Sequence, residues 1–140
     1  MRKKNWTVAA AAASLLAVAL PVVAHHAFEA EFDAKKRVNL RGTVTKLEWI
    51  NPHAWIHMDV KGPDGKAVNW DIELGPPNAL LKRGWTKTSV PPGKEIIVEG
   101  YQARDGANRA NGRDVTLPDG TKLFAGSSSE SAGVDVNSRK

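Results

Sequence analysis

The amino-acid sequence predicts an all-β protein with a small α contribution: a five- to six-stranded, OB-like Greek-key barrel with one short helix between strands three and four. Two observations carry this prediction. Short segments that alternate apolar and polar residues are separated by Gly- and Pro-rich turns. One helical segment interrupts them after the third strand, which is the element order of an OB-fold. A chain of 140 residues has room for one such domain, and a small meander or open sandwich is the alternative.

The chain begins with the three-part layout of a secretory signal peptide. A basic start at residues 2–4 precedes an apolar run over residues 8–20, and Val22 and Ala24 occupy the positions that signal peptidase reads. The run is shorter than the ~20 residues that span a bilayer, which makes a membrane anchor the weaker alternative. We therefore expect export to the periplasm, cleavage after Ala24, and a mature chain that begins at His25 without a membrane span.

Composition excludes several classes of function. The chain holds 20 basic and 15 acidic residues, and removing the three basic residues of the leader leaves 17 against 15, a net charge of +2. Proteins that bind nucleic acid usually carry a much larger excess of basic residues, so nucleic acid is not an expected partner. The chain has no cysteine. A hydrophobic core must therefore stabilise the fold, and any metal must be bound by imidazole, carboxylate or amine groups.

The mature chain divides into three parts. Residues 25–36 form a polar N-terminal arm, in which Phe28 and Phe32 are expected to anchor the segment on the domain. Residues 37–125 contain the strand and turn signals of the barrel. Residues 126–140 form a Ser-rich tail without apolar periodicity, which is expected to be disordered.

The first strand is predicted to contain a bulge. Apolar or small residues alternate from Val38 to Val44, whereas Leu47 and Trp49 fall in the opposite phase. A strand that changes face midway usually contains an extra residue. Gly42 lies inside this segment and permits strong coiling of the strand.

The segment from Asn51 to Val60 is the most informative strand. One side carries apolar residues, and the other carries polar and aromatic residues that no ordinary solvent face requires. The inward set is Ala54, Ile56, Met58 and Val60, and the outward set is His53, Trp55, His57 and Asp59.

Alternation and turn residues place the remaining elements. Two Pro-Asp-Gly sequences mark turns, and Pro76-Pro77 before residues 78–83 with Gly84 after them favour a short helix. The other expected elements are a third strand over residues 68–74, a fourth over 94–103, a long polar loop over 104–113, and short strands over 114–117 and 121–125.

Four segments of the chain are informative together: HHAFEAEFD, GTVTKLEWINPHAWIHMDV, WDIELGPPNALLKRGW and VTLPDGTKLFAG, of which the NPHAW and PPNALLKRGW pieces are the most specific. They resemble a family of small exported bacterial proteins, the domain of unknown function 6152. The resemblance covers the mature chain apart from its Ser-rich tail. It implies an envelope location and a compact β-barrel, and it implies no particular activity.

Metal binding is the most concrete function that the residues support. A mature chain beginning at His25 offers its α-amine and its imidazole to one ion, which resembles the N-terminus of histidine-brace copper proteins. These nitrogen ligands suit Cu(II), and an α-amine with a pKa near ~7.7 loses its proton at little cost at neutral pH. Copper is the one cofactor expected, with His26, His53 and His57 as candidates for a further ligand.

His53 and His57 are not expected to bind one ion together. On a regular strand they are separated by roughly 13 Å at ~3.3 Å per residue. At most one of them would join His25, and the pattern does not choose between them. The alternative is that both are structural side chains and that the His25-His26 pair is a flexible polar start.

A recognition site without metal is the alternative function. OB-type barrels bind oligosaccharides or nucleotides across strands two and three, between the first and last interstrand loops. The alternative is that residues 104–113 form a solvated, mobile loop, since aspartates in and beside it partly neutralise its charge, and that the tryptophans belong to the core. The residues that would bind a small anionic ligand or a glycan are Trp55, Asp59, Tyr101, Arg104, Arg109 and Arg113.

No catalytic residues are predicted. The chain has no cysteine nucleophile and no serine in a nucleophile elbow, and Asp71 and Glu73 at strand spacing are typical of a solvated face. We therefore expect a binding module rather than an enzyme, with a copper-dependent activity as the minor alternative. An envelope protein that contacts the Phe28/Phe32 arm or the tail is a further candidate partner.

Overall fold

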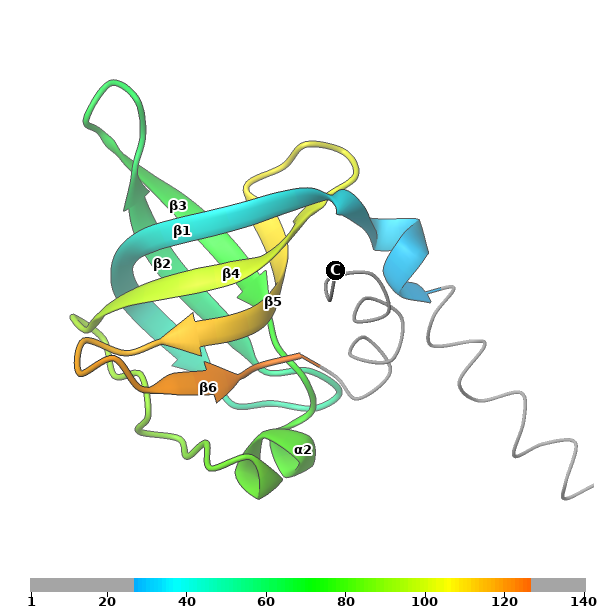
Figure 1. Ribbon diagram of the computed structural model, residues 1–140, viewed down its shortest axis with the longest axis vertical. Helices are drawn as coiled ribbons and strands as arrows, with labels where there is room; N and C mark the ends of the chain where they lie inside the picture. Colours follow the sequence, from blue (N-terminus) through cyan, green and yellow to red (C-terminus); the bar gives the residue numbers. More distant parts are fainter. Residues whose placement is uncertain (1–26, 127–140) are drawn as a thin grey trace, which may run out of the picture.

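The computed structural model describes residues 27–126, which Figure 1 shows as a small β-structure with short helices. The predictions for the leader, for His25 and His26, and for the tail over residues 127–140 lie outside the described residues. A helical turn at residues 27–31 precedes the first strand. The other elements are β1 (Phe32–Glu48), β2 (Trp55–Lys61), β3 (Ala67–Glu73), α2 (Pro77–Lys82), β4 (Glu95–Ala103), β5 (Arg109–Thr116) and β6 (Lys122–Phe124).

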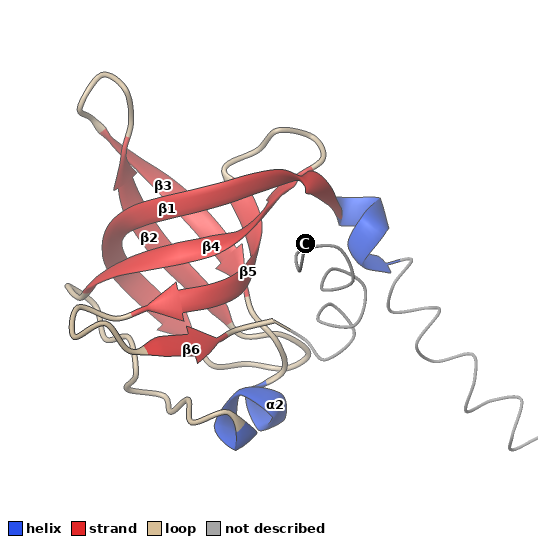
Figure 2. Cartoon of the chain, viewed as in Figure 1, coloured by secondary structure: helices blue, strands red, loops and turns tan. Residues whose placement is uncertain are grey.

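The strands form one sheet that closes on itself. β1 pairs antiparallel with β2 on one side and with β4 on the other, and these continue to β3 and β5. A parallel pairing between β3 and β5 completes the ring, and β6 extends β5. α2 lies below the ring in Figure 1, and Figure 2 shows how little of the described chain is helical. The predicted OB-like Greek-key barrel, with its helix between strands three and four, is confirmed.

The predicted bulge in the first strand is present. The register of β1 against β2 shifts between Val44 and Lys46, so one residue of β1 has no opposite partner. Gly42 lies where β1 passes close to β2, and a β-carbon there would stand 2.2 Å from the carbonyl oxygen of Asp59. The resulting coil lets β1 pair with β4 through its first half and with β2 through its second half.

The core fills the ring and confirms the inward set predicted for the second strand. Ile56 and Met58 are fully buried, and Val60 packs against the edge of the core. Trp85, which follows α2, is also buried, and its indole Nε1 donates to the carbonyl oxygen of Phe124 at 2.9 Å. Because the chain has no disulfide, burial of such apolar side chains is the main stabilising contribution to the fold.

The first strand begins at Phe32, whereas the sequence predicted an arm that ends just before Arg37. Phe32 pairs with Ala103 and Arg37 pairs with Tyr101, so the residues between them bulge away from the partner strand. Those residues are mostly polar, mostly exposed and without apolar alternation. The early part of β1 therefore carries no strand signal in the sequence.

The prediction of a polar loop over residues 104–113 is wrong for residues 109–113, which belong to a strand. β5 begins at Arg109 and pairs with β3 as well as with β4. Ala110 is fully buried, and a β-carbon on Gly112 would stand 2.8 Å from Ile72 Cγ2, so these inward positions admit only small residues. Because small inward residues produce no apolar alternation, the pattern does not reveal this part of the strand.

The helices of the described chain are short. In α2, Pro77 lies in the first turn and Lys82 in the last, as the sequence predicted. Gly84 follows with a φ of +89°, a conformation that glycine adopts without a steric penalty. Within residues 27–126, no helix has the length and apolar character needed to cross a membrane.

Candidate functional site

Alternation along β2 turns the predicted outward set away from the core, beside outward side chains of β3 and of the end of β1. Cross-strand register sets the neighbours, so that His57 lies opposite Asp71 on β3 and opposite Lys46 on β1. We call this surface the β2–β3 face, and it comprises Lys46, Glu48, His53, Trp55, His57, Asp59, Asn69, Asp71 and Glu73.

His57 lies between two carboxylates. Its Nδ1 is 2.5 Å from Asp71 Oδ1, a hydrogen-bond distance, and its Nε2 is 3.5 Å from Glu48 Oε1. Nε2 is buried and has no hydrogen-bond partner within residues 27–126, since 3.5 Å is beyond normal hydrogen-bond length. The His57 side chain is 25% exposed. One ring nitrogen is therefore held in place, while the other faces a second carboxylate without a hydrogen bond.

Glu48 is also bound by Lys46. A hydrogen bond from Lys46 Nζ lowers the pKa of Glu48 below its ordinary value of 4.5. Partial desolvation opposes this lowering of the pKa, whereas the charge of Lys46 and the neighbouring His57 ring add to it. Glu48 is therefore ionised at neutral pH, and Nε2 of His57 faces a negative charge.

His53 lies in the loop before β2 and contacts a different carboxylate. Its Nδ1 is 2.8 Å from Glu73 Oε1. Glu73 is only 8% exposed although it points away from the core, because Trp55 on β2 and Asn111 on β5 flank it. The sequence predicted Glu73 on a solvated face, and the closing of the ring by β5 accounts for its burial.

The structure does not bring the two strand histidines to a common centre. His53 and His57 each contact a carboxylate of their own. Within the described part of the chain, no group of three or more histidine, aspartate or glutamate side chains is placed to hold a metal ion. His25 and His26, the expected N-terminal ligands, lie outside that part.

Trp55 and Asp59 both take outward positions on the β2–β3 face. Trp55 is half-buried, with Glu48 and Glu73 opposite it on the neighbouring strands. Asp59 Oδ1 accepts a hydrogen bond from Asn69 Nδ2 at 3.1 Å. Trp55 is the one Phe, Tyr or Trp residue of β2.

Arg104 and Arg109 hold the N-terminal helical turn. The backbone amide of Arg104 donates to the carbonyl oxygen of Glu31 at 2.9 Å, and its side chain donates to the carbonyl oxygen of Glu29. The guanidinium of Arg109 lies 5.6 Å from the centre of the Phe32 ring and 4.0 Å from Glu31 Oε2. Two arginines that the sequence placed in a ligand-binding loop are thus already engaged within the chain.

Tyr101 is only 3% exposed, and its ring packs under the arm. Phe28 contacts it edge-on at 5.7 Å between ring centres and stacks on Phe32 at 5.8 Å. Phe28 and Phe32 therefore anchor the arm, as predicted. Tyr101 and Trp55 are not neighbours, because Glu73 of β3 and Asn111 of β5 lie between them in the register across the sheet.

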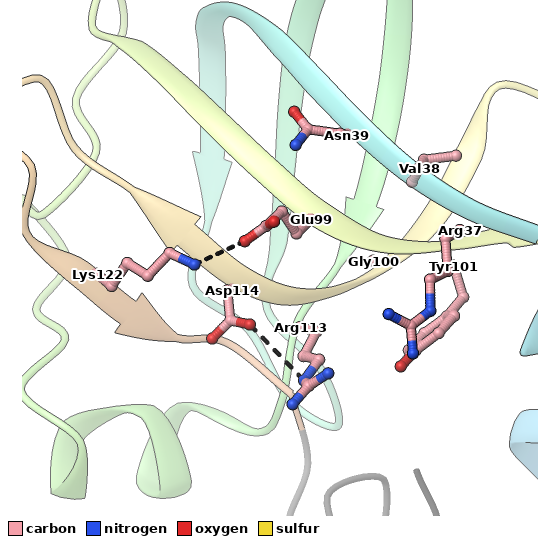
Figure 3. Close-up of a pocket in the computed structure, with 9 residues that line it drawn as sticks. All are labelled: Arg37, Val38, Asn39, Glu99, Gly100, Tyr101, Arg113, Asp114 and Lys122. Carbon is pink, nitrogen blue, oxygen red and sulfur yellow. Dashed lines mark hydrogen bonds and ion pairs between the residues drawn. The ribbon is translucent and has the colours of Figure 1, made fainter. Parts of the chain in front are cut away.

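A concave polar surface lies on the outside of the ring, over β1, β4, β5 and β6. We call it the polar hollow, and its volume is about 470 Å³. Figure 3 shows the side chains that surround it. The lining residues are Arg37, Val38, Asn39, Glu99, Gly100, Tyr101, Arg113, Asp114 and Lys122.

A bulge in β5 brings Arg113 to the polar hollow. The register between β4 and β5 shifts beside Gly100, which leaves Arg113 as the extra residue. Successive strand residues normally point to opposite faces, whereas Arg113 and Asp114 both line the hollow. A β-carbon on Gly100 would stand 2.0 Å from the carbonyl oxygen of Asn111, so the close approach of the two strands requires glycine.

The charges of the polar hollow are only partly paired. Lys122 Nζ donates to Glu99 Oε2 at 2.8 Å, and this hydrogen bond raises the pKa of Lys122 above its ordinary value of 10.5. Arg113 Nε lies 3.7 Å from Asp114 Oδ2. The guanidinium of Arg37 makes neither a hydrogen bond nor an ion pair with any residue that the structure describes. The hollow therefore contains one basic side chain that is free to bind a ligand.

Of the polar lining residues, the sequence indicated only Tyr101 and Arg113. Arg37, Glu99 and Lys122 occupy outward positions of β1, β4 and β6 that resemble any solvated strand face. What joins them is the register between strands far apart in the chain. No local pattern in the sequence carries that information.

Comparison with known proteins identifies the family and nothing closer. No curated protein and no solved structure matches the chain. Residues 10–112, more than half of the chain, match the sequence profile described as a family of unknown function, DUF6152. The match includes the whole β2–β3 face and part of the polar hollow. The chain therefore belongs to the DUF6152 family, in agreement with the resemblance that its motifs indicated.

Proposed function

We propose that the protein is an exported, non-catalytic module that binds a divalent transition metal, most concretely Cu(II). The observation that supports this proposal is the geometry of His57, whose two ring nitrogens have different roles. In the neutral imidazole, an Nδ1–H that donates to Asp71 leaves the lone pair on Nε2. A carboxylate that orients a histidine in this way is the usual partner of a metal-binding imidazole.

The position of Glu48 supports the same site. Its Oε1 lies 3.5 Å from Nε2 of His57. Two ligand atoms at ~2.1 Å from one ion are about 3.4 Å apart in a tetrahedral site and about 3.0 Å apart in a square-planar one. A small side-chain movement would therefore let both atoms bind one ion. The ion would displace Lys46 from Glu48, and this competition lowers the expected affinity of the pair alone.

Two protein ligands are too few for tight binding, so the N-terminus completes the proposed site. The α-amine and imidazole of His25 would supply two further nitrogen ligands, which favours Cu(II) over other divalent ions. Among the strand histidines the geometry favours His57 over His53. His53 has a carboxylate at one nitrogen, but its side chain is 40% exposed, and within residues 27–126 it makes no ion pair with a second carboxylate.

A Cu(II) titration monitored by electron paramagnetic resonance and tryptophan fluorescence tests the proposal. It compares the mature chain beginning at His25 with the same chain carrying one additional glycine, and with the variants His57→Gln and His53→Gln. We expect near-stoichiometric, nitrogen-rich binding that the additional glycine abolishes. His57→Gln should weaken it by about tenfold or more, whereas His53→Gln should have little effect.

Two results would contradict the proposal. Equal binding by the chains with and without the additional glycine would exclude the N-terminal ligands. Equal losses in His57→Gln and His53→Gln would exclude a specific role for the His57–Glu48 pair, because a surface effect of imidazole removal would then account for both. Circular dichroism of each variant shows whether the fold is retained.

A further inference from the structure

We infer that the polar hollow is a second, separate binding site, and that its ligand is a small sugar acid: a molecule with one carboxylate and several hydroxyl groups. The hollow shares no residue with the β2–β3 face, so this inference is independent of metal binding. Three properties of the hollow carry it: an unengaged pair of donors, a net charge that matches a single anion, and carboxylates placed to accept hydroxyl hydrogen bonds.

Arg37 and Tyr101 provide the donors. They are directly opposite each other on β1 and β4, and in Figure 3 the guanidinium and the hydroxyl project in the same direction. Neither the Arg37 guanidinium nor the Tyr101 hydroxyl has a hydrogen-bond partner within the described part of the chain. A guanidinium offers two parallel N–H groups to a carboxylate, and a phenol adds a third donor.

The packing of Tyr101 fixes the position of its hydroxyl. The side chain is buried except where it lines the hollow, and Phe28 contacts its ring edge-on. A ligand that binds this hydroxyl therefore does not have to immobilise a flexible side chain, which reduces the entropic cost of binding. Such a buried aromatic residue with one accessible polar atom is a usual feature of small-ligand sites.

The charge of the hollow favours a monoanion over phosphate. Arg37, Arg113 and Lys122 contribute three positive charges, while Glu99 and Asp114 contribute two negative charges, so the net charge is +1. Lys122 and Arg113 already have carboxylate neighbours, which leaves Arg37 as the main binding group for an anion. A doubly charged phosphate would be repelled by the two carboxylates.

The same carboxylates suit a hydroxylated ligand. The carboxylate oxygens of Glu99 and Asp114 accept hydrogen bonds, and Asn39 offers both a donor and an acceptor. Sugar hydroxyls can satisfy all three. A volume of about 470 Å³ lies within the ~300–1,000 Å³ typical of small-molecule sites. Together these groups match one carboxylate and several hydroxyls rather than an apolar or strongly cationic ligand.

Isothermal titration calorimetry on the full mature chain tests the inference with D-glucuronate, D-glucose, acetate and inorganic phosphate as probes. We expect measurable binding of glucuronate, and at least about tenfold weaker binding of glucose, which lacks the carboxylate that Arg37 would bind. Acetate and phosphate should also bind at least about tenfold more weakly than glucuronate, because acetate lacks hydroxyls and phosphate meets like charges.

Two variants and a control locate the site. Arg37→Gln removes the charge, and Tyr101→Phe removes only the hydroxyl and keeps the ring that packs against Phe28. Each should weaken glucuronate binding by about tenfold. Arg41→Gln is the control, because Arg41 is also an exposed arginine of β1 but binds Glu95 at 2.6 Å outside the hollow. It should leave binding unchanged.

Several results would overturn the inference. The first is no detectable glucuronate binding. The second is equal binding of all four probes, which would indicate weak and unspecific anion association. The third is an equal loss in Arg41→Gln and Arg37→Gln, which would assign any binding to overall charge rather than to the hollow. None of these results bears on Cu(II) binding at the β2–β3 face.

Discussion

The β2–β3 face and the polar hollow lie on the same side of the same sheet, the side away from the core, yet they are built differently. On the β2–β3 face, His57 contacts Asp71 of β3 through regular register, and His53 contacts Glu73 from the loop before β2. In the hollow, the arrangement depends on an irregular backbone, where a bulge at Arg113 lies beside a glycine contact between β4 and β5.

The two surfaces differ in how the backbone brings their charged side chains together. Regular alternation places side chains that satisfy one another, and the result is a network of paired charges. An interrupted register places consecutive side chains such as Arg113 and Asp114 on one side and leaves a concave surface between strands. We therefore expect the hollow to be sensitive to backbone changes and the β2–β3 face to be sensitive to side-chain changes.

The largest effect is expected from Gly100→Ala. The new β-carbon would stand 2.0 Å from the carbonyl oxygen of Asn111, and neither strand can move without breaking its pairing. We expect the free energy of unfolding to fall by about 3 kcal/mol, measured by urea denaturation. The control is Gly62→Ala, whose nearest contact is the flexible side chain of Asp64 at 3.2 Å. An equal loss in both variants would mean that the strand contact at Gly100 is not rigid.

A smaller effect is expected from the His57–Asp71 pair. A double-mutant cycle with His57→Gln and Asp71→Asn should give a coupling free energy of about 1 kcal/mol, because the hydrogen bond is partly shielded from water. The same cycle on Arg41 and Glu95, whose side chains are 73% and 56% exposed, should give less than about 0.5 kcal/mol. Equal coupling in the two pairs would remove the distinction between the β2–β3 face and an ordinary surface.

The smallest effect is expected from the titration of Glu48. Its pKa is lowered mainly by the hydrogen bond from Lys46, so Lys46→Gln should raise that pKa toward 4.5, as measured by NMR. Because the folded-state pKa is lowered, the stabilising contribution of Glu48 is present above its unfolded pKa. It is lost as the pH falls through the folded pKa. A pKa that stays unchanged in Lys46→Gln would show that the hydrogen bond does not form in solution.

The sequence predicted the faces and the bulge of single strands, but not the contacts between strands. The alternation from His53 to Asp59 predicted both faces of β2, and the opposite phases of Val44 and Leu47 predicted the bulge in β1. The alternation also placed Asp71 and Glu73 outward, but it could not pair them with His57 and His53. That pairing depends on the register between β2 and β3, which a one-residue shift would change completely.

The sequence by itself determined the order of the strands, the short helix and the apolar lining of the core, because each follows from local periodicity and turn chemistry. Only the tertiary structure decided where β5 begins, why Glu73 is buried, and that Arg37, Tyr101 and Arg113 surround one hollow. The physical reason is that these features come from strands that meet when the ring closes. Residues distant in the chain then become neighbours through backbone hydrogen bonds, which the side-chain pattern does not record.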